Sequence, residues 1–282
     1  MEVGKEESFT VVCPQYFVEQ VERNFNMQSL THENLSQLKE LKTELTRFTA
    51  VYKFALDEVN TKINILKEEF SIIHEYNPIE HCNSRLKSPE SILKKIFKKN
   101  IDFSLDAIKE NIKDIAGIRI TCSFKSDIYA LCDMIEKQKD IEVIERKDYI
   151  KNPKPNGYQS LHLIVKVPVF LSDREESVCV EIQIRTIAMD FWASLEHKIY
   201  YKYEKDIPNR LASELKAAAD SASALDDKME KIHNEVKELK NESLNEQLDE
   251  VLDLSSLTAT RDKIMQGIIQ QLIDKPKRLN EQ

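Results

Sequence analysis

The sequence predicts an α+β protein in which helices flank a β-sheet. Three observations support this fold class. The chain has 282 residues, of which 41% are hydrophobic and 32% charged, so it can bury a real core. Only 4 glycines and 8 prolines interrupt it, which disfavours architectures built on many tight turns. The apolar residues repeat with a helical period towards both ends and with a period of two in the middle.

Helical periodicity defines the segments on either side of the predicted sheet. From about residue 31 to residue 73, apolar residues recur at steps of three and four. This spacing predicts one long helix, or two joined helices, ended by Asn77 and Pro78. Further helices are expected over 127–137, 186–203 and 209–239, and the last has a strict heptad seam. The pattern also allows a short helical segment over about 259–273.

Alternating polar and apolar residues predict strands over 118–124, 161–167 and 178–185, with a weaker run at 141–149. One face of each strand belongs to the core, and the other is polar. The polar faces combine guanidinium, phenol, imidazole, amide and carboxylate groups, contributed by Arg119, Tyr158, His162, Glu181, Gln183 and Arg185. Such a face suits a polyanionic, ring-bearing ligand with a divalent metal. Ordinary cross-strand pairs on a solvated face are the alternative.

Two further features favour an anionic ligand. Asp114 lies at the entrance of the first strand and Glu181 within a later one, and oxygen ligands from separate strands can hold Mg²⁺. Two surface acids would look the same. Between Arg85 and Lys99 there are six basic residues and one acidic residue, in a chain of net charge −8. This segment could neutralise a triphosphate or a nucleic-acid backbone, or form a solvated helix face.

The overall charge and the cysteines exclude several classes of protein. A pI near 5.5 disfavours a globally basic nucleic-acid binder. The 5 cysteines have no CxxC spacing, so we expect reduced thiols in a cytoplasmic protein and neither a disulfide framework nor a zinc site. The first residues lack the apolar region of a signal peptide, and no apolar run approaches the length of about 18 residues that spans a membrane.

Four stretches together carry a specific resemblance to a known family. They are PIEHCNSRLKSPESILKK (78–95), KDIAGIRITCSF (113–124), NPKPNGYQSLHLIV (152–165) and EIQIRTIAMDFWASLEHKIYYKY (181–203). In this order they resemble the RelA/SpoT-type alarmone synthetases, specifically the small single-domain synthetases of bacteria. The resemblance implies a mixed, mainly antiparallel sheet of the nucleotidyltransferase-like synthetase fold, with long N- and C-terminal helices.

We therefore expect a single synthetase domain over 31–240. It would comprise N-terminal helices over 31–77, a catalytic core over 78–205 and a C-terminal helix over 206–240. A lead-in over 1–30 would precede it. Residues 241–282 would follow as a mobile linker with the short terminal helix.

The resemblance also implies an activity and assigns roles to residues. The family transfers pyrophosphate from ATP to the ribose 3′-hydroxyl of GDP or GTP, giving ppGpp or pppGpp, the alarmones of the stringent response, plus AMP. Asp114 and Glu181 match the acidic pair that binds Mg²⁺, and Glu181 is also the candidate for activating the 3′-hydroxyl. The residues that match the ATP site are Arg85, Lys87, Ser91, Lys95 and Arg119. Tyr158 matches the aromatic that stacks on guanine, beside His162, Gln183 and Arg185.

Departures from the family pattern and rival functions complete the prediction. Asp190 stands where some relatives carry Asn. No His is followed by Asp, so we expect no HD-type hydrolase. Two other functions stay open: pyrophosphorylation of tRNA 3′ ends, as in a toxic branch of the family, and a catalytically silent oligomeric module that binds RNA or nucleotide. Nucleic acid is a conceivable partner but not the expected one.

Self-association is also expected. Relatives among the small synthetases form homotetramers, and the seams at 38–59 and 211–239 are typical of helices that pack on other long helices. The interfaces would then lie on the N-terminal helices and on the helix after Asn209, with the nucleotide clefts facing outward. The alternative is that both seams pack within one subunit.

Overall fold

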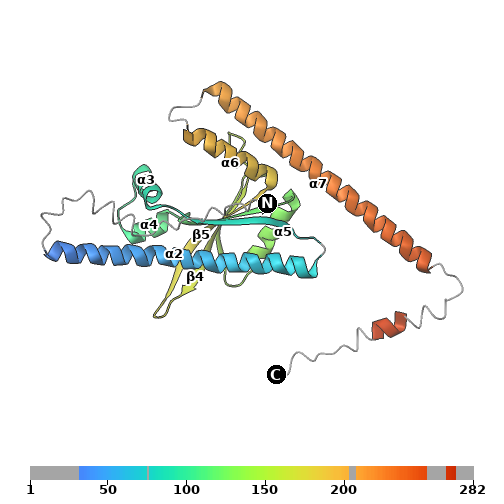
Figure 1. Cartoon of the computed structure of the whole chain (residues 1–282), viewed down its shortest axis with the longest axis horizontal. Helices are drawn as coiled ribbons and strands as arrows, with labels where there is room; N and C mark the ends of the chain where they lie inside the picture. Colours follow the sequence, from blue (N-terminus) through green and yellow to red (C-terminus); the bar gives the residue numbers. More distant parts are fainter. Residues whose placement is uncertain (1–31, 75, 203–207, 253–264, 271–282) are drawn as a thin grey trace, which may run out of the picture. The chain divides into compact units, whose positions relative to one another are not determined.

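The computed structural model describes residues 32–74, 76–202, 208–252 and 265–270 (Figure 1). The predicted lead-in over 1–30 lies outside these residues. In chain order the elements are α2 (His32–Ile73), β1 (Ile79–Leu86), α3 (Pro89–Lys99), α4 (Leu105–Asn111), β2 (Ala116–Cys122), α5 (Lys125–Glu136), β3 (Glu142–Asp148), β4 (Leu161–Phe170), β5 (Glu175–Thr186), α6 (Ile187–Lys202) and α7 (Asn209–Leu252).

The sheet has five strands in the order β1-β2-β5-β4-β3. Strands β2 and β5 pair in parallel, whereas β1 with β2, β5 with β4 and β4 with β3 are antiparallel. The predicted mixed, mainly antiparallel α+β fold is therefore confirmed. The four runs of alternating residues correspond to β2, β3, β4 and β5, with shifts of a few residues at their ends.

Strand β1 and the short helix α4 were not predicted from the sequence. Strand β1 is an edge strand that pairs only with β2, and most of its residues are exposed or half-buried. Its sequence IEHCNSRL therefore lacks the alternation by which the other strands were recognised. Helix α4 spans only seven residues, too few for a helical period to stand out. Both short helices begin at a serine whose hydroxyl caps the first turn, Ser88 for α3 and Ser104 for α4.

The main core lies between one face of the sheet and helices α2 and α5. Helix α2 crosses the sheet and contacts β1, β2, β4 and β5 (Figure 1). Its buried residues join the apolar residues of the strands and those of α5 in one cluster. From Phe48 to Val59 the α2 seam therefore packs within the subunit, because the sheet offers the apolar surface that this stretch needs.

Helix α7 packs on the core through small and polar residues rather than through its predicted seam. Ala219 and Asp226 are buried, whereas the seam residues Leu225 and Met229 are 55% and 49% exposed. The Thr186 hydroxyl donates to Asp226 over 2.5 Å. Other bonds to this helix come from the Trp192 indole, which donates to the Leu215 carbonyl, and from Lys125, which pairs with Asp227. Small side chains let the helix approach closely, so the apolar stripe is rotated out of the contact.

The chain divides into two compact units, Met1–Asp227 and Lys228–Gln282. In the second unit α7 continues to Leu252, into the stretch for which the sequence suggested a linker. No glycine or proline occurs between Lys240 and Leu252, so nothing in this stretch ends the helix. Residues 265–270 form a helical segment, inside the range 259–273 in which the sequence allowed a short helix. The rest of that range lies outside the described residues. No helix in the described part of the chain has the length and apolarity needed to cross a membrane.

Gly157 is a residue whose replacement by a larger one should disturb the fold. Its φ is +88°, and a Cβ added there would lie 2.6 Å from the Ala219 Cβ on α7. We expect Gly157→Ala to lower the free energy of unfolding by about 2 kcal/mol, from backbone strain and overpacking together. Urea unfolding measures this change. Gly267→Ala is the control, because an added Cβ there meets nothing within 4 Å. Equal unfolding free energies for the two variants would contradict the prediction.

Candidate active site

The strand register places polar side chains in rows across the sheet. In one row Asn83, Arg119, Gln183, His162 and Lys147 are successive partners on β1, β2, β5, β4 and β3. Partner residues in neighbouring strands point to the same side of a sheet. The three residues of this row that were singled out from the sequence therefore share one face.

The adjacent row joins Arg85, Gly117 and Glu181 on β1, β2 and β5. Gly117 has no side chain, so it leaves room on this face between the guanidinium and the carboxylate. A Cβ there would meet only the Glu181 carbonyl oxygen, at 3.8 Å. A small side chain would therefore fit without a clash at this point of the row, beside Glu181.

Glu181 accepts two converging chains of hydrogen bonds that both start at Arg185. In one chain the Arg185 NH2 group donates to the Tyr158 hydroxyl over 2.6 Å, this hydroxyl contacts Nε2 of His162 at 2.8 Å, and Nδ1 of His162 contacts Oε1 of Glu181 at 3.2 Å. In the other, Arg185 donates to the Gln183 carbonyl oxygen over 2.9 Å, and the Gln183 amide donates to Oε2 of Glu181 over 2.8 Å. Both carboxylate oxygens are thereby fixed in place.

The hydrogen bonds to Glu181 favour its ionised form. An ionised carboxylate only accepts, so Nδ1 of His162 donates to it. Burial by itself raises the pKa of Glu181, but the hydrogen bonds from His162 and Gln183 outweigh it, and the net pKa lies below the ordinary value. Glu181 is therefore held as an anion on a mostly buried face.

Asp114, just before β2, is held by two lysines. Its Oδ2 lies 3.0 Å from the Lys87 ammonium and 2.6 Å from that of Lys95. Burial by itself raises the pKa of Asp114. The two lysines lower it by more than burial raises it, so the net pKa is below the ordinary carboxyl value. Its other oxygen, Oδ1, is buried without a hydrogen-bond partner among the described residues. A buried carboxylate oxygen without a partner is a group that a cation would satisfy.

These two carboxylates fit a divalent metal such as Mg²⁺. The charge of Asp114 raises the pKa of Glu181, so the two groups lie near enough to interact. Both are oxygen donors from separate elements, as hard cations prefer, and the lysines beside Asp114 could hold phosphates next to the ion. The donor set and the unpartnered Oδ1 would thus suit such an ion.

Arg119 lies between the other predicted arginines. Burial, and then the positive charges of Arg185 and Arg85, lower the pKa of Arg119, while Asp190 opposes this shift. Oδ1 of Asp190 contacts both Arg119, at 3.2 Å, and Arg185, at 3.1 Å. The acid that departs from the family pattern therefore points into the site. Ser91 is placed differently, since it lies in the first turn of α3 and its hydroxyl accepts from Ser88.

The surroundings of Tyr158 include residues to which sequence reasoning gave no role. Tyr149 lies edge-on to His162, with ring centroids 5.2 Å apart, and Lys154 places its ammonium 4.6 Å and 4.7 Å from the rings of Tyr149 and Tyr158. Asn156 accepts from the backbone N–H of Tyr158 and donates to Glu196. Lys154 and Asn156 belong to the stretch 152–165, so their closeness in sequence to Tyr158 was the available signal.

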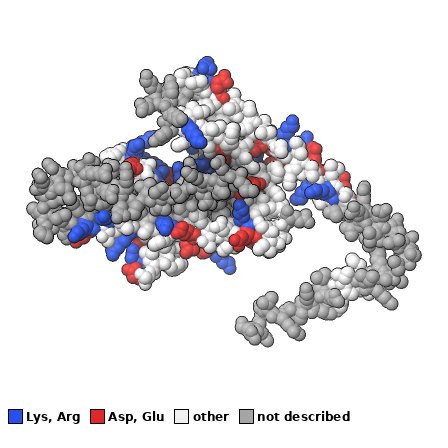
Figure 2. Space-filling model, viewed as in Figure 1, with Lys and Arg blue, Asp and Glu red and all other residues white. Residues whose placement is uncertain are grey.

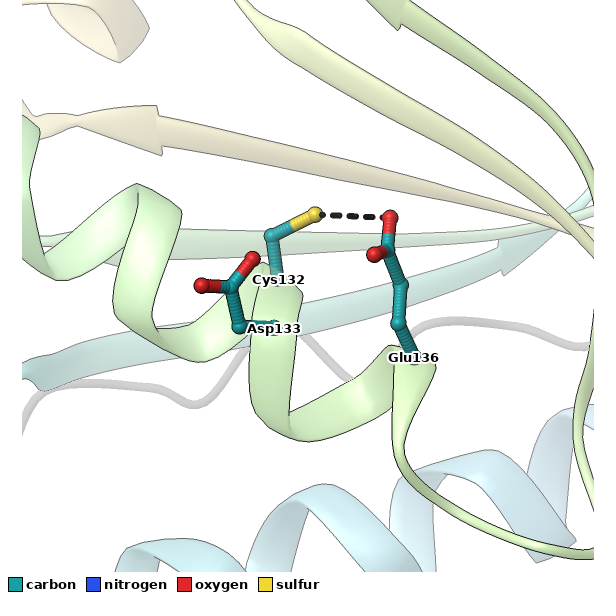
Figure 3. A group of neighbouring side chains, drawn as sticks. All are labelled: Cys132, Asp133 and Glu136. Carbon is teal, nitrogen blue, oxygen red and sulfur yellow. Dashed lines mark hydrogen bonds between the residues drawn. The ribbon is translucent and has the colours of Figure 1, made fainter.

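One other group of potential metal ligands lies on α5, away from this face. Cys132, Asp133 and Glu136 have ligand atoms within 4.8 Å of one another (Figure 3). The Cys132 thiol is buried and donates to Glu136, which also pairs with Arg146. Burial raises the pKa of this thiol to about 12, so it stays protonated and is a poor ligand.

Charges of both signs lie on the described part of the face drawn in Figure 2. On the face drawn in Figure 2, basic side chains lie among acidic ones rather than forming a continuous basic surface. The most basic segment of the sequence runs from Arg85 to Lys99. Its Lys87 and Lys95 form ion pairs with Asp114. Part of its positive charge therefore serves the candidate site rather than an extended surface.

Comparison with known proteins shows the family of this chain. Residues 84–206 match the family described as a region found in RelA / SpoT proteins. The GTP pyrophosphokinase YwaC of Bacillus subtilis is 52% identical over 208 residues, which are 74% of this chain and 98% of that protein. A second Bacillus subtilis GTP pyrophosphokinase, YjbM, is 40% identical over 68% of this chain and 90% of its own length.

Solved structures give the same result. The small alarmone synthetase 2 of Bacillus subtilis superposes with a TM-score of 0.63 at 52% identity, covering 68% of this chain and 99% of its own. The small alarmone synthetase 1 of the same organism, bound to its product pppGpp, has a TM-score of 0.64 at 38% identity over 68% of this chain and 98% of its own. The shared sequence and fold together mean that the chain belongs to the RelA/SpoT family, among the small alarmone synthetases.

Proposed function

We propose that this protein is a GTP pyrophosphokinase that transfers pyrophosphate from ATP to the ribose 3′-hydroxyl of GDP or GTP. The products are ppGpp or pppGpp and AMP. Family membership supports the reaction type, and relatives of known structure bind pppGpp and the ATP analogue AMPCPP. The observation that carries the proposal in this chain is the convergence of two hydrogen-bond chains on an ionised Glu181. The charge of Asp114, which two lysines hold, also acts on the pKa of Glu181.

Asp114 and Glu181 would hold Mg²⁺. When bound, the ion neutralises charge on the transferring phosphates. Lys87 and Lys95 form ion pairs with Asp114 in this structure. Their side chains are long enough to turn towards the same phosphates. We assign Ser91, at the start of α3, to the same donor-phosphate region.

The reaction itself is a displacement at the β-phosphorus of ATP. A bond forms between the 3′-oxygen and this phosphorus, while its bond to the oxygen that bridges to the α-phosphorus breaks and AMP leaves. Glu181, kept ionised by His162 and Gln183, accepts the proton of the 3′-hydroxyl. Most of the catalytic effect then comes from positioning and charge neutralisation, as in other phosphoryl transfers.

The two nucleotides would bind on either side of Glu181. Arg85 and Arg119 are placed on β1 and β2, where their guanidinium planes could stack on adenine. Tyr158 would stack on guanine, with His162, Gln183 and Arg185 forming the rest of that pocket. The exposed Lys154 ammonium, now 4.7 Å from the Tyr158 ring, would be displaced by the base or remain on the other side.

The direct test uses labelled ATP, Mg²⁺ and three candidate acceptors, namely GDP, GTP and tRNA. We expect label on the guanine nucleotides and AMP as the second product. Asp114→Asn and Glu181→Gln should each lower turnover by about 100-fold or more while the far-UV circular dichroism stays unchanged. Asp133→Asn, an exposed acid on α5, is the matched control and should keep full turnover. Label on tRNA alone, or no transfer at all, would rule out this function.

The two pockets should be separable by substitution. Tyr158→Ala removes a stacking ring, so we expect the KM for the guanine nucleotide to rise about tenfold or more and that for ATP to change little. Arg85→Ala should have the opposite effect through lost guanidinium stacking and charge. Steady-state kinetics with one nucleotide saturating measures each KM. Equal losses for both nucleotides in both variants would count against the division.

We also propose a homotetramer in the cytoplasm, where both nucleotides are made and used. The support is the exposed apolar stripe of α7, whose residues Leu225, Met229, Ile232, Val236 and Leu239 are 44% to 64% exposed. The α2 seam is used within the subunit, so the interfaces would fall on the C-terminal helices. Light scattering at micromolar concentration should give about four times the chain mass of 32.9 kDa, and a species at the mass of one chain would oppose the assembly.

We also propose the boundaries of the synthetase domain, from the family match and the helices on either side of it. Residues 31–240 form the synthetase domain, because the family match over 84–206 is flanked by α2, which lines the core, and by α7. Residues 1–30 and 241–282 would lie outside it.

A further inference from the structure

A single carboxylate oxygen joins the two halves of the candidate site. Oδ1 of Asp190, in the first turn of α6, lies 3.2 Å from NH1 of Arg119 on β2 and 3.1 Å from NH1 of Arg185 on β5. The Asp190 side chain is 26% exposed, against 33% for Arg119 and 5% for Arg185. The acid is therefore a shared counter-charge for two guanidinium groups that would otherwise repel each other.

The two arginines depend on Asp190 to very different degrees. Arg185 also donates to Ser160, Tyr158 and Gln183, so it has partners on several sides. For Arg119 the ion pair in the described part of the chain is the one with Asp190, and its buried Nε has no hydrogen-bond partner there. Loss of Asp190 would release Arg119 and leave Arg185 held.

We propose that Asp190 is a positioning residue for ATP binding, which holds the Arg119 guanidinium in place against the like charges of Arg185 and Arg85. This inference rests on the proposed function, because that function assigns Arg119 to the adenine pocket. Asp190 acts through Arg119 and need not touch the nucleotide. Its effect should therefore fall on ATP and spare the guanine nucleotide, although the same oxygen contacts Arg185 on the guanine side.

The test is the substitution Asp190→Asn, which keeps the shape and one acceptor oxygen but removes the charge. Binding of a non-hydrolysable ATP analogue and of GDP is measured by calorimetry with Mg²⁺ present. We expect the Kd for the ATP analogue to rise about tenfold, as for a lost charge-assisted hydrogen bond, and the Kd for GDP to change less than about twofold. Asp190→Glu, which restores the charge, should recover part of the loss, and Asp133→Asn is the matched control.

A double-substitution cycle separates positioning from a general structural effect. In an Arg119→Ala background, Asp190→Asn should cause no further loss of ATP-analogue binding, because the group through which it acts is gone. Additive losses, an unchanged Kd, or tighter ATP binding in Asp190→Asn would overturn the proposal. Tighter binding would mean that Asp190 repels the phosphates instead.

Binding also distinguishes this inference from the proposed function, since it needs no turnover. Suppose that Asp190→Asn weakens binding of the ATP analogue as expected, but the wild-type protein transfers no label. This result would contradict the proposed reaction and support the positioning role. Full transfer activity with no effect of Asp190→Asn on ATP would do the reverse. Asp190→Asn could lower the unfolding temperature strongly. In that case the comparison uses Asp190→Glu with an unchanged unfolding temperature, which must bind the ATP analogue better than Asp190→Asn does. Failure to do so would count against the proposal.

Discussion

The Arg185 guanidinium determines the geometry of the whole candidate site. It is 5% exposed, and from one nitrogen it donates to both Tyr158 and Gln183. The two chains that begin there end on the two oxygens of Glu181. The His162 and Gln183 donors both point towards the carboxylate, so they stabilise its charged form and fix its orientation together. Glu181 is thus pre-oriented before any nucleotide binds, which is the condition for efficient transfer.

The parallel pairing of β2 with β5 makes this network useful. It sets Gly117 beside Glu181 and Arg119 beside Gln183, so a position without a side chain and a second cationic group lie next to the fixed carboxylate. Helices α2 and α5 cover the apolar side of the same strands, which leaves their polar side for ligands. On that side Asp114 supplies a second carboxylate with an unpartnered oxygen, and Asp190 supplies the counter-charge between the arginines. Core packing and site chemistry therefore come from opposite faces of one sheet.

Much of this architecture could be predicted from the sequence because burial on one face leaves an alternating pattern. That pattern predicted four strands and the polar face they share, and the resemblance to a family supplied roles for the residues on it. Strand β1 was missed because its inner face is only partly apolar, with Cys82, Ser84 and Leu86 half-buried, so its sequence shows no clear alternation. The inward face of α7 was missed because Ala219 and Asp226 carry no apolar periodicity, whereas the exposed stripe does. The partners of Arg185 and Asp190 depend on strand register and side-chain conformation, which one sequence does not encode in any local pattern.

The central claim is that Glu181 and Asp114 together form the reaction centre between two nucleotide pockets. A crystal structure of the protein with Mg²⁺, a non-hydrolysable ATP analogue and GDP tests it most directly. The account predicts that the ion contacts both carboxylates, that guanine lies on Tyr158, and that the ribose 3′-oxygen lies beside Glu181 and faces the β-phosphorus. An ion bound away from these carboxylates, or a 3′-oxygen remote from Glu181, would contradict it.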